Sequence, residues 1–196
     1  DDYQQDHYQL ITGWQISPAL KLSLTGHYTY GRGYFEQYKE DESFEEIGFD
    51  DQVIGADTIT SSDMILQRWL DNHFYGGVYS LEYRKGKFNA TLGGAYNEYL
   101  GEHFGEVIWA EYAQGTRIRE RYYFSESKKS DFSQYLKTEY SWAKWTLYAD
   151  FQMRALSYSG KGLDNDQRAI LIDENYLFLN PKGGVSFRPN QNNQFY

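Results

Sequence analysis

The sequence predicts an all-β fold, an antiparallel up-and-down meander in which each strand pairs with the next strand along the chain. Three observations support this fold. Apolar and polar residues alternate with period two in several segments, the connections between these segments are alternately short and long, and aromatic residues gather at the ends of the apolar stripes. Together they are typical of a segment of a transmembrane β-barrel with short turns at one rim and long loops at the other.

The alternation is clearest in residues 145–155, where Trp145, Leu147 and Phe151 occupy odd positions and polar residues such as Asp150 and Gln152 lie between them. Similar patterns cover the segments 7–16, 20–31, 74–83, 88–97, 132–140 and 183–188. Residues 194–196 resemble the start of another strand. A strand of eleven residues extends about 36 Å, which gives a height of about 25 Å at a tilt of about 45°. This height fits the apolar band of an outer-membrane barrel.

The connections provide an independent signal. Short connections are expected at residues 17–19, 84–87, 141–144 and 189–193, and long ones at 36–63, 100–124 and 160–173. In an up-and-down meander this order places all short turns at one end of the sheet and all long loops at the other. Pro18 and Pro189 fall in short turns, and Pro181 is expected to open a strand, a position that sheets tolerate.

Each strand should have one apolar and one polar face. We expect one face to carry Leu22, Leu24, Leu92, Leu147, Phe151 and Met153, and the other to carry Ser23, Thr25, Thr91, Asp150 and Gln152. A soluble β-sandwich would explain this alternation equally well. The placement of aromatic residues at the stripe ends favours an interfacial girdle instead, formed by Trp14, Tyr28, Tyr30, Tyr75, Tyr83, Tyr96, Tyr140 and Trp145.

Composition and charge exclude several classes of protein. The chain has no cysteine, so it forms neither disulfides nor thiolate metal sites, and its longest apolar runs of about four residues are far below the roughly 20 of a membrane helix. The net charge of −9 argues against a nucleic-acid partner. All of it arises in residues 36–63, where ten acidic residues face the single base Lys39. This segment is expected to be a solvated loop, with a rim that attracts cations as the alternative.

No constellation of residues indicates catalysis. The four histidines are dispersed without metal-ligand spacing, and no carboxylate pair is fixed by a regular element, so we predict neither an enzyme, nor a metal site, nor a cofactor. The candidate ligand-binding residues are the aromatic side chains of the long loops, Trp109, Tyr112, Tyr122 and Tyr123. Such rings can stack on sugars or planar chelates, and the alternative is that they pack within a folded loop.

Four segments carry a resemblance to a known family. They are residues 31–38 (GRGYFEQY), 68–77 (RWLDNHFYGG), 103–110 (HFGEVIWA) and 180–184 (NPKGG). These segments resemble the barrel domain of TonB-dependent outer-membrane receptors. The resemblance implies a protein of the bacterial outer membrane that imports a scarce ligand through a barrel of 22 strands around an N-terminal plug. An iron chelate, haem, cobalamin or a glycan would be such a ligand.

The resemblance also defines the expected domain and partners. Residues 1–196 would form a partial β-barrel of about seven strands plus the start of another, without a plug domain. The implied partners are outer-membrane lipid, the plug and remaining barrel strands, TonB through segments outside this chain, and a small-molecule or glycan ligand. A soluble or surface all-β binding module and a passive porin are the alternatives.

Overall fold

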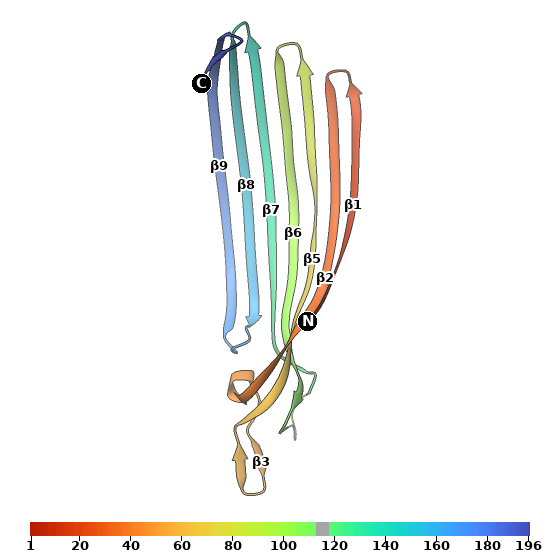
Figure 1. Ribbon diagram of the computed structural model, residues 1–196, viewed down its shortest axis with the longest axis vertical. Coiled ribbons are helices and arrows are strands. Elements are labelled where there is room, and N and C mark those ends of the chain that lie inside the picture. The colour runs from red at the N-terminus through yellow and green to blue at the C-terminus, as the bar shows by residue number, and fades with distance from the viewer. Residues whose placement is uncertain (113–117) are drawn as a thin grey trace.

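The computed structural model describes residues 1–112 and 118–196, and Figure 1 shows a single twisted sheet of long, adjacent strands. The long strands are β1 (Asp2–Ser17), β2 (Leu20–Ser43), β5 (Ser61–Lys85), β6 (Phe88–Ala110), β7 (Arg121–Trp142), β8 (Trp145–Leu163) and β9 (Ala169–Asn190). The short elements are the 3-10 helix η1 (Glu45–Ile47) and the strands β3 (Gln52–Ile54), β4 (Asp57–Ile59) and β10 (Asn193–Phe195). Among the described residues, no helix is long and apolar enough to cross a membrane.

The main sheet has eight strands in the order β1-β2-β5-β6-β7-β8-β9-β10, and every pair is antiparallel. The sheet is open, with β1 and β10 at its ends, and β3 and β4 form a separate hairpin inside the β2–β5 connection. This arrangement confirms the predicted all-β antiparallel meander. Its short turns lie at one end of the sheet and its longer connections at the other, as Figure 1 shows.

The strands are longer than the sequence pattern indicated. The connections expected at 36–63, 100–124 and 160–173 all begin later and end earlier, because they span only residues 44–60, 111–120 and 164–168. The physical reason is that the backbone ladder continues where the period-two pattern fades. Charged and aromatic residues can occupy both faces of a strand there, because backbone hydrogen bonds do not depend on which face is apolar.

Pro181 does not open a strand. It lies in the middle of β9, opposite Phe151 of β8. On the other side of β9, the described part of β10 pairs only with Asn190 and Phe187, so no strand lies beside Pro181 there. A strand at such an edge tolerates a residue without an N–H group.

The pairing register confirms the predicted division of the two faces. Leu22 lies opposite Leu81, Leu81 opposite Leu92, Leu92 opposite Leu136, and Leu136 opposite Phe151. Residues directly opposite each other share a face, so this row forms one continuous apolar stripe. We call the face that carries it the apolar face. The adjacent row on the other side, the polar face, carries Lys21, Glu82, Thr91, Lys137, Asp150 and Lys182.

Fully buried apolar side chains lie almost entirely at the loop end of the sheet. The cluster formed there, the loop-base cluster, consists of Phe44, Ile47, Met64, Leu66, Val107, Ala110, Tyr122 and Tyr123. Leu66 and Val107 are direct cross-strand partners, and η1 and its flanks cover them through Phe44 and Ile47. Elsewhere the sheet is one layer thick, so large side chains such as Leu136 and Phe151 remain about half exposed.

Candidate ligand-binding surfaces

The four aromatic residues proposed from the sequence occupy two different environments. Trp109 is the second-last residue of β6, and Tyr112 follows that strand. Their side chains are 45 % and 39 % exposed. Tyr122 and Tyr123 follow Arg121, the first residue of β7, and are each only 8 % exposed. The structure thus brings Tyr122 and Tyr123 together and leaves the rings of Trp109 and Tyr112 accessible.

Tyr122 and Tyr123 belong to the loop-base cluster. Their rings meet edge to face with centroids 4.9 Å apart, and Gly105 on β6 lies beneath both, where an added Cβ would collide with each ring. Burial raises the pKa of Tyr122 and raises that of Tyr123 to about 12. Both tyrosines therefore stay neutral, and their rings pack within the loop-base cluster. Packing within a folded loop is the alternative to ligand stacking that the sequence left open.

Backbone contacts fix the position of Tyr112. Its N–H donates to the Ser62 hydroxyl at 3.1 Å, and the N–H of Glu111 donates to the Asp63 carbonyl at 2.9 Å. Asp63 is itself held, since its carboxylate accepts hydrogen bonds from the Tyr38 hydroxyl and, at 3.0 Å, from the Asp41 N–H. These hydrogen bonds lower the pKa of Asp63. The hydrogen bond between Tyr38 and Asp63 also raises the pKa of Tyr38 to about 12.

The third connection, between β8 and β9, contacts the first. Gln167 adopts a left-handed backbone with φ of 59°, and its side-chain amide donates to the Tyr122 carbonyl at 2.8 Å. The same side chain lies beside Gly48, where a Cβ would be 3.1 Å from its Oε1 atom. Gly48 also has a left-handed φ of 68°, so it suits this position for two reasons. The loop end is therefore one connected unit around the aromatic candidates.

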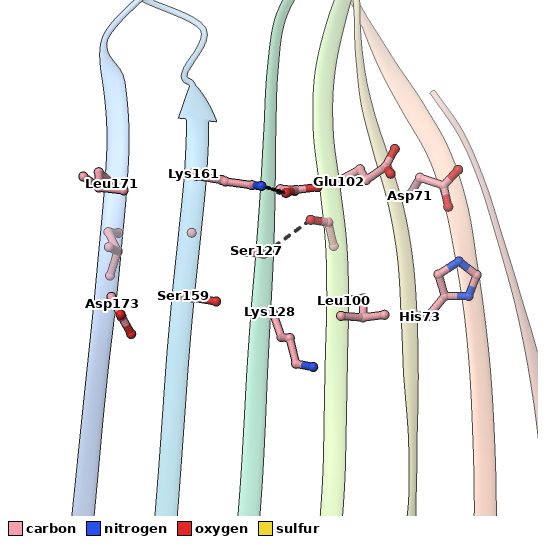
Figure 2. A pocket seen from close by; sticks show the side chains of 14 residues that line it. Asp71, His73, Leu100, Glu102, Ser127, Lys128, Ser159, Lys161, Leu171 and Asp173 are labelled. Atoms are coloured by element: carbon pink, nitrogen blue, oxygen red, sulfur yellow. Dashed lines mark hydrogen bonds and ion pairs between the residues drawn. The ribbon is translucent and has the colours of Figure 1, made fainter.

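A recess of about 740 Å³ lies on the apolar face toward the loop end, and Figure 2 shows its lining. Two adjacent rows supply most of it, one running from His73 through Leu100 and Lys128 to Asp173, the other from Asp71 through Glu102 to Lys161. Lys161 pairs with Glu126 at 2.8 Å, as drawn in Figure 2, and Lys128 pairs with Glu98 at 3.0 Å. Both lysines of the recess are thus paired with carboxylates.

The sequence pattern does not predict this recess, because parts of its lining fall in the connections expected at 100–124 and 160–173. The signal that could have found it is the alternation of charged residues Glu98, Glu102 and Glu106 with Asn97, Tyr99 and His103. Such a period of two continues the strand.

A second recess, of about 580 Å³, lies on the polar face of β1, β2, β5 and β6. Its lining residues are Tyr3, Gln5, His7, Gln9, His27, Thr29, Asn72, Phe74 and Tyr99. None of these nine residues is an aspartate, glutamate, lysine or arginine. In the part of the chain that the structure describes, no group of three or more histidine, aspartate or glutamate side chains could hold a metal ion.

Comparisons with known proteins identify the fold. No protein-family model and no curated protein sequence matches this chain. Among solved structures, the unliganded ferric citrate transporter FecA superimposes on this chain with a TM-score of 0.57 at 12 % identity. The superposition covers 96 % of this chain and 26 % of FecA. BauA, the ferric preacinetobactin receptor from Acinetobacter baumannii, superimposes with a TM-score of 0.53 at 8 % identity, with coverage of 96 % and 29 %.

The chain therefore spans between a quarter and a third of the length of these two proteins. At such low identity the likeness concerns the fold alone. The sheet described above has the fold of a segment of a TonB-dependent receptor barrel.

Proposed function

We propose that this chain is part of a bacterial outer-membrane receptor that imports a scarce ligand, with the apolar face against lipid and the polar face lining the barrel interior. It acts as a transporter, not as an enzyme. The plug, the remaining barrel strands and coupling to TonB belong to parts outside this chain. The two structural neighbours are named for ferric citrate and ferric preacinetobactin, which supports a role in ligand import. The proposed cargo is a small molecule or a glycan.

One observation carries the proposal, an apolar band on one face bounded by two aromatic rows. The row nearer the turns joins Phe88, Tyr140 and Leu147, and the row nearer the loops joins Tyr8, Tyr28, Tyr75 and Glu98. Ten positions separate Phe88 from Glu98 along β6. They extend about 33 Å, or about 25 Å at a tilt of about 40°, which matches the height of the apolar band of outer-membrane barrels.

Polar anchors end this band on the loop side. The carboxylate of Glu98 accepts hydrogen bonds from the hydroxyls of Tyr75 at 2.6 Å and Tyr96 at 2.7 Å, and pairs with Lys128. The tyrosine rings thus keep their apolar bodies toward the band and their hydroxyls toward charge, as interfacial aromatic residues do. Beyond them, the charged lining of the 740 Å³ recess suits water and lipid headgroups.

At the loop end, the exposed rings of Trp109 and Tyr112 are the proposed first contacts for the ligand, and Tyr122 and Tyr123 support them by packing within the loop-base cluster. The acidic segment 36–63 lies at the same end and attracts cations.

Cell fractionation tests the proposal. The complete protein, produced in a Gram-negative host, should be found in the outer-membrane fraction, resist extraction with alkaline carbonate, and change its electrophoretic mobility on heating, because a folded barrel binds less detergent than the unfolded chain. Recovery in the periplasm as a soluble monomer would contradict it. Ligand uptake that persists unchanged in a host lacking TonB would instead identify a passive porin.

A further inference from the structure

The recess on the polar face has the features of a built surface, because glycines beneath it allow side chains to lie flat. The side chains of Tyr3 and Asn72 occupy the space where a Cβ of Gly31 would be, and Asn72 donates to the Tyr3 hydroxyl at 3.5 Å. In the same way the ring of Tyr99 covers Gly101, where a Cβ would be 2.7 Å from Cε1 of the ring. Two aromatic faces are therefore held against the sheet.

Hydrogen bonds fix the two histidines of the recess. Nδ1 of His7 lies 2.9 Å from the Thr29 hydroxyl. Nε2 of His27 lies 2.8 Å from Oδ1 of Asn97, whose side chain crosses above Gly76 in the intervening strand to reach it. The His27 ring also packs on Phe74 with centroids 4.9 Å apart. These contacts hold the recess in shape without any ion pair among its lining residues.

The two faces of the same strand segments differ in charge. On the apolar face at this height lie Asp6, Arg32, Asp71, Glu98 and Glu102, whereas the recess on the polar face presents only aromatic rings, amides, a hydroxyl and imidazoles. Charged residues are the usual means of solvating an exposed wall, and their absence from this lining calls for another reason. Apolar faces combined with a few placed polar groups are the composition of small-molecule sites.

This composition selects the class of ligand. An anionic chelate would require cationic partners, which the lining lacks, and would have to pass ten acidic residues at the loop end. A sugar ring presents C–H groups on its faces and hydroxyls around its edge. The first suit the aromatic rings of Tyr3, Phe74 and Tyr99, and the second suit amides such as Gln5 and Gln9, which both donate and accept.

We propose that the recess formed by Tyr3, His7, His27, Asn72, Phe74 and Tyr99 is a subsite for the sugar ring of a neutral oligosaccharide. The inference rests on the proposed function, because the polar face lines the passage only in an outer-membrane barrel. It deepens that function by assigning an uncharged, polyhydroxylated cargo, in contrast to the ferric chelates for which the two structural neighbours are named.

The test is calorimetric titration of the complete receptor, purified from outer membranes in lauryldimethylamine oxide, because maltoside detergents would compete for a sugar site. The probes are maltohexaose, cellohexaose and mannohexaose, with ferric citrate as the anionic comparison. We expect at least one saccharide to bind, and both Tyr99→Ala and Phe74→Ala to weaken it about ten-fold. The matched control is Tyr135→Ala, since the Tyr135 ring covers Gly93 on the same face outside the recess and its loss should leave affinity unchanged.

Several results would overturn the inference while leaving the proposed function in place, provided that fractionation and heat-dependent mobility show a folded barrel. They are failure of all three saccharides to bind at about 1 mM, equal affinity in wild type and Tyr99→Ala, or binding of ferric citrate that the same substitutions weaken. A lower barrel stability in Tyr99→Ala and Phe74→Ala without any saccharide binding would overturn the inference as well, because these rings pack across β5 and β6 and would then serve the sheet alone. Absence of the protein from the outer membrane would instead refute the proposed function itself.

Discussion

The turn-side and loop-side halves of the same strands carry their apolar residues on opposite faces. In β5, Leu81 near the turns lies on the apolar face, whereas Leu66 near the loops lies on the polar face and is fully buried. In β6, Leu92 and Val107 repeat this change of face. On the loop side, the chain's own β2–β5 connection covers the polar face, whereas the apolar stripe of the turn side remains exposed. Burial within the chain itself therefore accounts for the apolar residues in only one half of each strand.

The largest expected effect is on the loop side. Phe44→Ala removes a fully buried ring from the loop-base cluster, so it should cost about 3–5 kcal/mol of the local free energy of unfolding. Limited proteolysis of the β2–β5 connection measures this opening. Phe35→Ala, at an exposed position of the preceding strand β2, is the control and should have a much smaller effect. Equal cleavage rates in the two variants would show that the cluster does not hold the loops.

On the turn side, Phe151→Arg places a cation in the apolar stripe. It should destabilise the barrel in lipid vesicles by about 2–4 kcal/mol if the residue is near the bilayer midplane, as measured by urea unfolding. The neighbouring Gln152→Arg places the same charge on the polar face and should be close to neutral. A reversal of this order would exchange the assignments of the two faces.

A glycine substitution sharpens the contrast at smaller cost. Gly105→Ala forces a methyl group against the buried rings of Tyr122 and Tyr123, and should destabilise the loop end by about 1–3 kcal/mol. Gly26→Ala is the turn-side control, because a Cβ there meets no atom within 4 Å. Thermal unfolding of both variants checks the difference, and a stable Gly105→Ala protein would mean that the two rings can shift apart.

The smallest effect concerns pH at the first connection. Because its hydrogen bonds lower the pKa of Asp63, the stabilisation they provide is present above the ordinary pKa of 3.8 and is lost as the pH falls through the lowered value. The Tyr38 hydroxyl, with a pKa of about 12, keeps its proton well above pH 10. Hydrogen exchange of the Asp41 amide, corrected for its intrinsic pH dependence, should show this loss of protection in acid. Tyr38→Phe should shift the loss to higher pH.

How far the sequence predicts the structure also differs between the halves. Near the turns, strands such as 145–155 were predictable because one face carries apolar residues and the other polar residues, which gives the sequence a period of two. Near the loops, Arg68, Asp71 and Glu102 lie on strands without such a contrast, so the ladder was not visible and the connections were expected to be longer. The packing of Tyr122 and Tyr123 depends on Phe44 and Gly105, which are distant in sequence, and no local pattern reports that contact.

Pairing only between sequence neighbours has a consequence for how the sheet is made. Each ladder of the main sheet joins a strand to the next long strand along the chain, and four of its seven connections are two-residue turns. The entropy of loop closure therefore stays small at most steps, and the longest interruption, residues 44–60, adds only modestly because that entropy grows with the logarithm of length. Folding can then advance hairpin by hairpin from any point of the sheet, with each completed strand acting as the template for its successor. The slow step would be the single non-local event, the meeting of the first and last edges of the complete barrel, because rates fall as contacts become more distant in sequence.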